Sequence, residues 1–120
     1  MPKQVKVDET KARALLKEQG TLAATACYAP EPGAIDAVLF ERRRQFAKWG
    51  EQNHDMMTWL AILHEETGEL SEACLHKKFG GPEAGNVLGE AIQVAAVALQ
   101  IVEYLRRQNR ETFEAQAHND

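Results

Sequence analysis

Apolar residues recur every three to four positions along most of the chain, which is the spacing of one face of an α-helix. Helix start and stop signals bound the stretches that show this pattern. The expected helices run from Asp8 to about Gln19, from Ile35 to Trp49, from Thr58 to Phe79, and from near Asn86 past Tyr104 to about Gln108. No stretch alternates with the period of two that a half-buried strand shows. The pattern predicts an all-α fold with a four-helix, bundle-like arrangement.

Glycine and proline mark where the expected helices stop. Gly20 follows the first helix, two prolines and a glycine fall within residues 29–33, and Gly80-Gly81-Pro82 ends the third helix. Residues 21–28 are apolar and ambiguous, and residues 50–55 read as a connecting loop. We therefore divide the chain into an N-terminal helix and linker of unknown role (1–34), a helical domain (35–109) and a polar C-terminal tail (110–120). We expect this tail to fray or to form a short turn.

The third expected helix carries a dense acidic segment, residues 64–72, with the sequence HEETGELSE. At about 100° per residue its four carboxylates occupy about a third of the helix circumference. Glu66 and Glu69 border the apolar face, while Glu65 and Glu72 lean towards solvent. Like charges one turn apart repel, and Gly68 destabilises a helix by about 1 kcal/mol relative to alanine. A turn that tolerates both effects favours a binding site, and the alternative is a solvated acidic helix face.

The fourth expected helix places one carboxylate among apolar residues. Between Val87 and Val102 only Gly89, Glu90, Gln93 and Gln100 are not apolar, so we expect this helix to be buried nearly all round. A buried carboxylate must be paired or must coordinate a metal. Glu90 and Gln93 share one side of the helix and can face Glu66 and Glu69, and such oxygen ligands suit Mg²⁺ or Mn²⁺. The alternative is an ion pair between Glu90 and a distant arginine of the run 42–44.

Composition narrows the class of protein. The 120 residues are 44% apolar, enough for one buried core, and 14 basic against 18 acidic residues give a net charge of −4. A net-acidic domain argues against binding to a phosphate backbone. Cys27 and Cys74 are too isolated for a disulfide framework or a zinc site, so we expect reduced thiols. The N-terminus lacks a secretory signal, and residues 87–102 are too short and polar for a membrane span. We expect a soluble cytoplasmic protein that binds neither nucleic acid nor membrane.

These residues resemble a known family. The segment 65–69 (EETGE) followed by 90–93 (EAIQ) is similar to the paired acidic motif, EExxE and then ExxD, of the all-α nucleoside triphosphate pyrophosphohydrolases, the MazG-like enzymes. The likeness extends through ERRRQ at 41–45, KWGEQNH at 48–54, TWL at 58–60 and QVAAV at 93–97. It covers roughly residues 40 to 106, and the combination resembles the small phage and bacterial MazG-like subgroup. The first forty residues match nothing in this pattern.

The resemblance implies hydrolysis of a nucleoside triphosphate between its α- and β-phosphates, giving a monophosphate and pyrophosphate. Glu66, Glu69 and Glu90 would ligate Mg²⁺ (Mn²⁺ is possible), and Glu65 would ligate it or orient the attacking water as a catalytic residue. Gln93 stands where the motif has aspartate, and it can ligate only through a neutral oxygen. The family also implies a homodimer or homotetramer, for which the small side chains of Ala91, Ala95, Ala98 and Val102 allow close contact.

Candidate substrate-binding residues precede and begin the third helix. Arg44 and Lys48 belong to a basic run that can bind phosphates, or that forms an ordinary solvated face. Trp49 and Trp59 can stack a base or can be core residues, and His54 lies in a loop between them. Two further hypotheses remain beside the pyrophosphohydrolase. One is a non-catalytic helical interaction module, which Gln93 favours, and the other is a related enzyme acting on a modified nucleotide or a non-nucleotide.

Overall fold

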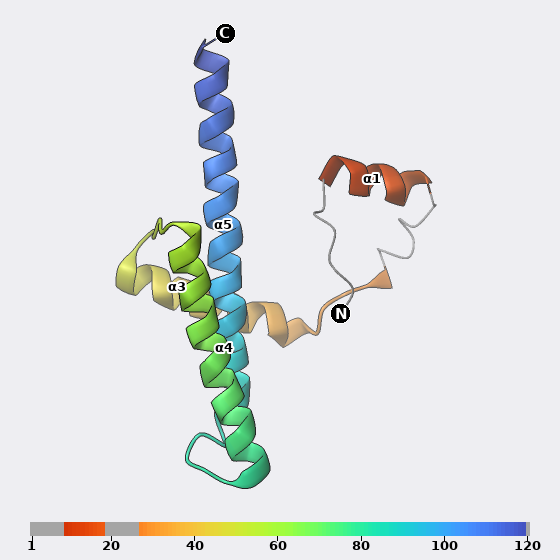
Figure 1. The fold of residues 1–120 in the computed structure, drawn as a ribbon. Coiled ribbons are helices and arrows are strands. Elements are labelled where there is room, and N and C mark those ends of the chain that lie inside the picture. Colours follow the sequence, from red (N-terminus) through yellow and green to blue (C-terminus); the bar gives the residue numbers. More distant parts are fainter. Residues whose placement is uncertain (1–8, 19–26, 120) are drawn as a thin grey trace. The chain divides into compact units, whose positions relative to one another are not determined.

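The computed structural model describes residues 9–18 and 27–119, and over these residues it is helical and contains no strand. The helices are α1 (Glu9–Glu18), α3 (Pro32–Trp49), α4 (Met56–Phe79) and α5 (Val87–Asn119) (Figure 1). This confirms the all-α class. The predicted ends of the first helix, Asp8 and Gln19, lie outside the described residues, as do residues 21–26 of the ambiguous segment. The chain divides into two compact units, Met1–Glu31 and Pro32–Asp120.

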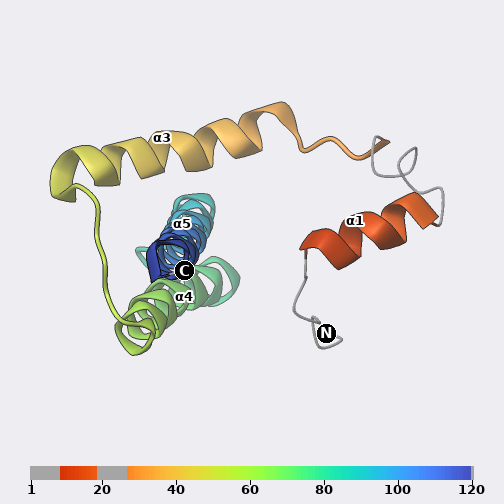
Figure 2. The ribbon, with the colours of Figure 1, turned by 90° about the horizontal axis from the view of Figure 1, so that it is seen from above.

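In the second unit, α4 and α5 run antiparallel and side by side, and α3 crosses the pair (Figures 1 and 2). Among the described residues the apolar core is small, and it consists of Trp59, Ala73, Ala96 and Val97. Buried polar side chains accompany it: Glu41, Gln45 and Gln100. The buried alanines of α4 and α5, Ala73 and Ala96, allow the two backbones to approach closely.

Two helices begin earlier than the sequence predicts. Helix α3 starts at Pro32 rather than Ile35, because proline in the first turn lacks an N–H that would find no partner there anyway. Helix α4 starts at Met56 and is capped by Asp55, whose Oδ1 accepts the Thr58 N–H at 2.8 Å. The predicted start at Thr58 therefore lies inside the helix, and Thr58 is the donor to the cap. The predicted end at Phe79 is confirmed, and Gly80 donates its N–H to the His76 carbonyl.

Helix α5 continues to Asn119, so the expectation that residues 110–120 fray or form a short turn is wrong for residues 110–119. No proline or glycine follows Gly89 in the chain, and most residues after Tyr104 are good helix formers. Beyond the region where α4 accompanies it, α5 projects alone (Figure 1). Its helical hydrogen bonds therefore persist without a neighbouring helix of the same unit.

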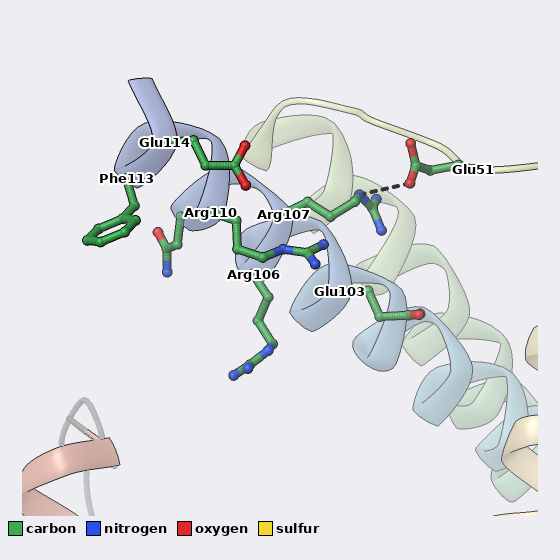
Figure 3. Close-up of a pocket in the computed structure, with 8 residues that line it drawn as sticks. Glu51, Glu103, Arg106, Arg107, Arg110, Phe113 and Glu114 are labelled. Atoms are coloured by element: carbon green, nitrogen blue, oxygen red, sulfur yellow. Dashed lines mark ion pairs between the residues drawn. The ribbon is translucent and has the colours of Figure 1, made fainter. Parts of the chain in front are cut away.

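A hollow of about 610 Å³ lies along this C-terminal part of α5 (Figure 3). Arg107 at its edge pairs with Glu51 from the α3–α4 loop at 3.2 Å. The other charged residues lining it are Glu103, Arg106, Arg110 and Glu114. Three arginines therefore meet three glutamates, and this balance gives the hollow no net attraction for an anion or a cation.

The expectation that α5 is buried nearly all round is wrong for this single chain. Only Ala96, Val97 and Gln100 of the helix are fully buried. One face stays open along its length, with Leu88 and Phe113 each 73% exposed and Val102 52% exposed. At 100° per residue these three side chains, together with Ala91, Ala95, Ala98 and Leu105, fall on one side of the helix. We call these seven residues the α5 stripe.

By length and composition alone, α5 could cross a membrane. The apolar window that meets this criterion lies within Val87–His118, and 17% of it is buried. The helix is longer than the stretch 87–102 considered in the sequence, so the argument from short length is wrong. Core helices of soluble proteins share this length and composition, and the finding therefore does not place the chain in a membrane.

Candidate metal centre

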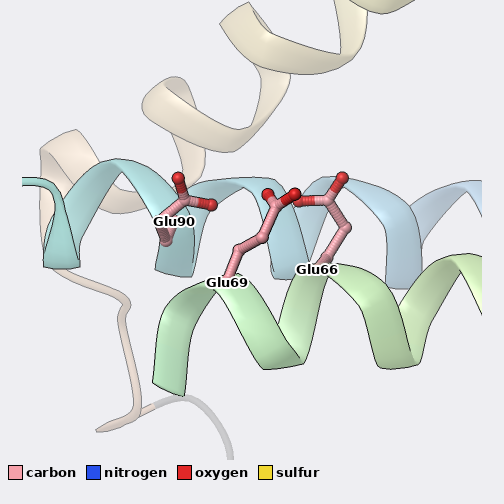
Figure 4. A group of neighbouring side chains, drawn as sticks. All are labelled: Glu66, Glu69 and Glu90. Carbon is pink, nitrogen blue, oxygen red and sulfur yellow. The ribbon is translucent and has the colours of Figure 1, made fainter. Parts of the chain in front are cut away.

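Three carboxylates from two helices meet at one point. Glu66 and Glu69 lie one turn apart on α4, and Glu90 lies in the first turn of α5. One carboxylate oxygen from each lies within 4.8 Å of the other two (Figure 4). The antiparallel pairing of α4 and α5 creates this arrangement, because the α4–α5 turn brings the start of α5 back alongside α4. We call these residues the Glu triad.

The Glu triad holds polar atoms that protein groups do not satisfy. Oε2 of Glu66 and Oε2 of Glu90 are buried and have no hydrogen-bond partner. Two of the three arginines considered as partners for Glu90 are engaged elsewhere: Arg42 pairs with Glu103 at 3.0 Å and Arg44 pairs with Glu41 at 2.6 Å. The third, Arg43, is exposed. Buried carboxylate oxygens without donors are unfavourable unless a cation approaches them. The donor set, three glutamates, is of the kind that Mg²⁺ and Mn²⁺ take.

The pKa shifts within the Glu triad also favour a bound cation. Burial raises the pKa of Glu66 above its ordinary value, and the negative charges of Glu69, Glu90 and Glu65 raise it further. Burial also raises the pKa of Glu90, with Glu69 as the largest neighbouring charge. In both cases the folded protein disfavours the ionised form. A divalent cation reverses this, because it replaces the lost hydration and offsets the repulsion.

The flanking residues of the acidic segment take different positions. Glu65 is exposed and adjoins the Glu triad without belonging to it. A Cβ built at Gly68 would meet nothing within 4 Å. No described neighbour therefore requires a glycine at this position. His64 is exposed.

Gln93 lies in a different network. Its Nε2 donates to Glu41 Oε1 at 2.8 Å, and its Oε1 accepts from Gln45 Nε2 at 3.3 Å. Glu41 also accepts two close hydrogen bonds from Arg44, at 2.6 and 2.9 Å. Glu41 and Gln45 are not among the site residues that the sequence predicts. Their spacing of four residues places both on one face of α3, but nothing local shows that α5 covers this face.

A cavity of about 180 Å³ adjoins the Glu triad through Glu66. Arg44, Trp49 and Gln93 also line it, with the side chains of Gln45, Gln52, Ile62, Val97 and Gln100 completing the wall. Trp49 is 52% exposed, and the Lys48 Nζ lies 4.6 Å from the centre of its ring. One cavity is thus lined by four residues selected from the sequence. They supply the guanidinium of Arg44, the ring of Trp49 and the side chains of Glu66 and Gln93.

Trp59 and His54 are not part of this cavity. Trp59 is fully buried, and its ring makes an edge contact with His54, 4.9 Å between ring centres. The ring of Tyr104 lies 6.0 Å from Trp59. Because Trp59 presents no free face, the core alternative holds for it, and His54 supports it from the α3–α4 loop.

No family model, no curated protein and no solved structure matches the chain. The resemblance to the MazG-like enzymes therefore stays a prediction from sequence, and the candidate metal centre is described from its geometry.

Proposed function

We propose that this protein is a divalent-cation-dependent nucleotide pyrophosphohydrolase, which cleaves a nucleoside triphosphate to a monophosphate and pyrophosphate. The observation that carries the proposal is the Glu triad, with its two buried oxygens that lack protein donors. It adjoins a cavity that contains Arg44 and Trp49. A cation site beside a guanidinium and an aromatic ring suits a molecule that has phosphates and a base.

Glu66, Glu69 and Glu90 would hold Mg²⁺, with Mn²⁺ as an alternative. Once bound, the cation neutralises phosphate charge, polarises the attacked phosphorus and lowers the pKa of water. The chain itself supplies the remaining functions. Arg44 binds a phosphate, Trp49 stacks against the base with Lys48 above its ring, and the exposed Glu65 ligates the cation or orients the attacking water.

We further propose that the protein forms a homodimer or homotetramer in the cytoplasm and that it binds neither nucleic acid nor membrane. The α5 stripe supports the assembly, because an apolar face of this length is rarely left in water by a stable protein. The net charge of −4 supports the absence of nucleic-acid binding.

A pyrophosphate-release screen over canonical and deoxynucleoside triphosphates, with Mg²⁺ and with Mn²⁺, tests the activity. We expect Glu69→Gln and Glu90→Gln each to lower turnover by about 100-fold or more, since even loss of a metal's outer partners lowers activity by 10–100-fold. Glu72→Gln is the matched control, because Glu72 lies on the same helix but outside the Glu triad. Undiminished release by both triad variants would contradict the assignment of the metal centre.

A non-catalytic helical interaction module is the second candidate. The observation that favours it is the amide of Gln93, which stands where the motif has a carboxylate and donates to Glu41. Thermal unfolding separates the two functions, because a cation that binds the folded state raises the midpoint by an amount that grows with the logarithm of its concentration over Kd. No release and no stabilisation by Mg²⁺ or Mn²⁺ would favour the module. Release only from a modified nucleotide would favour the related enzyme.

A further inference from the structure

The amide of Gln93 has a fixed orientation between two helices. Its nitrogen faces the Glu41 carboxylate, because an amide oxygen there would meet a negative charge with no proton to share. Its oxygen consequently faces Gln45 Nε2 at 3.3 Å. Both ends of this amide are therefore engaged by residues of α3, and neither is directed to the Glu triad by a hydrogen bond.

Glu41 links Gln93 to Arg44. The carboxylate is 8% exposed and accepts from Arg44 Nη2 at 2.6 Å and from Arg44 Nε at 2.9 Å. Hydrogen bonding to Arg44 holds the pKa of Glu41 below its ordinary value, against the opposing effect of burial, and Gln93 lowers it further. The ionised, buried carboxylate of Glu41 thus holds the guanidinium of Arg44, and the amide of Gln93 on α5 holds the carboxylate. The half-exposed guanidinium of Arg44 lines the cavity beside Glu66.

We infer that Gln93 is a positioning residue for the anion-binding guanidinium of Arg44, acting through Glu41, and is not a ligand of the cation. This rests on the proposed function, in which Arg44 binds a phosphate. The network requires an amide at position 93, since Glu41 needs a donor there. A carboxylate at this position would place a second negative charge beside Glu41 without a proton between them.

The decisive comparison is a reciprocal exchange. Gln93→Glu and Glu41→Gln each break the carboxylate–amide pair, and the double variant E41Q/Q93E restores it with the partners reversed. We expect each single variant to lower the unfolding midpoint and the double variant to recover most of the loss, as a direct contact requires. A double variant no more stable than the sum of the single effects would overturn the contact.

The positioning role is tested without turnover. Binding of inorganic pyrophosphate in the absence of metal, followed by calorimetry, reports on Arg44, and binding of Mn²⁺, followed by electron paramagnetic resonance, reports on the Glu triad. We expect Gln93→Leu to weaken pyrophosphate binding by about fivefold, the loss of one net hydrogen bond. Arg44→Met should weaken it at least as much. The Mn²⁺ affinity of Gln93→Leu should stay within about twofold of the parent.

Arg43→Met is the matched control, because it removes an exposed neighbouring guanidinium outside this network. A tenfold or larger loss of Mn²⁺ affinity in Gln93→Leu would make Gln93 a ligand and overturn the inference. So would pyrophosphate binding that is absent in the parent or unchanged in both Arg44→Met and Gln93→Leu. Loss of nucleotide turnover as such does not bear on these measurements, so a failure of the proposed activity remains distinct from a failure of the positioning role.

Discussion

At the scale of single residues, Glu66 shows that the Glu triad is unfavourable as it stands. Its folded environment raises its pKa, first through burial and then through Glu69 and Glu90. A carboxyl with a raised folded pKa binds protons more readily in the folded than in the unfolded chain. Its contribution to stability is therefore present below the ordinary value of 4.5 and is lost as the pH rises through the raised value.

Glu66→Gln should accordingly stabilise the metal-free protein at neutral pH. The variant removes like-charge contacts that are each unfavourable by about 0.2–0.5 kcal/mol, so we expect a midpoint higher by a few degrees and a weaker pH dependence above 4.5. With Mg²⁺ present the parent should have the higher midpoint, because only the parent is stabilised by the cation. Thermal melts from acid to neutral pH, with and without Mg²⁺, measure both effects. A lower midpoint for the variant without metal would show that the Glu66 charge is stabilising.

The residues of the Glu triad could be selected from sequence because helical phase alone places them. Glu66 and Glu69 share a face by their spacing, and Glu90 stands out among apolar neighbours. The partner of Gln93 could not be selected in this way. Glu41 lies 52 positions away in the chain and meets Gln93 only because α3 crosses α5. For Trp59 the sequence left the core and the stacking roles open, and its burial between α4 and α5 decided for the core.

At the scale of elements, the turn between α4 and α5 aligns Glu90 with Glu69. Gly81 in this turn has φ of 154°, and a Cβ there would clash with the ring of His76. The His76 ring cannot simply move aside, because its Nδ1 accepts the Glu83 N–H at 3.1 Å. The ring, the glycine and the turn therefore form one constrained unit.

Gly81→Ala should destabilise the protein by about 1–3 kcal/mol, the range for a residue forced into an unfavourable backbone conformation. Gly85→Ala is the matched control in the same turn, since its Cβ would meet nothing within 4 Å. Denaturant unfolding of both variants measures the difference. Equal free energies of unfolding for the two variants would show that the His76 contact does not constrain the turn.

Helix interiors could be predicted, as could the ends at Trp49 and Phe79 that a glycine follows, whereas the starts of α3 and α4 could not. The period of apolar residues depends on the local sequence, whereas Asp55 caps α4 through a side chain that competes with Thr58 for the same role. The length of α5 was underestimated for a related reason. Its polar C-terminal half has no apolar period to reveal it, yet it contains no residue that would stop the helix.

At the scale of the whole molecule, the α5 stripe is an apolar face that no described element of the second unit covers. Leu88, Val102 and Phe113 are more than half exposed, and the described core of the second unit is small. A second copy of the chain or a membrane could cover such a face. The stripe contains small side chains at Ala91, Ala95 and Ala98, which favour close helix–helix contact over contact with lipid chains.

Val102→Glu should therefore weaken self-association, because it places a charge in the middle of the α5 stripe. Light scattering after size-exclusion chromatography should show the parent as a dimer or tetramer and the variant with a Kd higher by about tenfold or more. Gln108→Glu, on an exposed position outside the stripe, is the control.

All three carboxylates of the Glu triad come from one chain, so Mn²⁺ affinity should survive dissociation. A monomeric parent would show that the α5 stripe does not mediate self-association. A parent that sediments with lipid vesicles, when Val102→Glu does not, would show that the stripe binds a membrane. A Val102→Glu monomer that had lost Mn²⁺ would show instead that the partner completes the site.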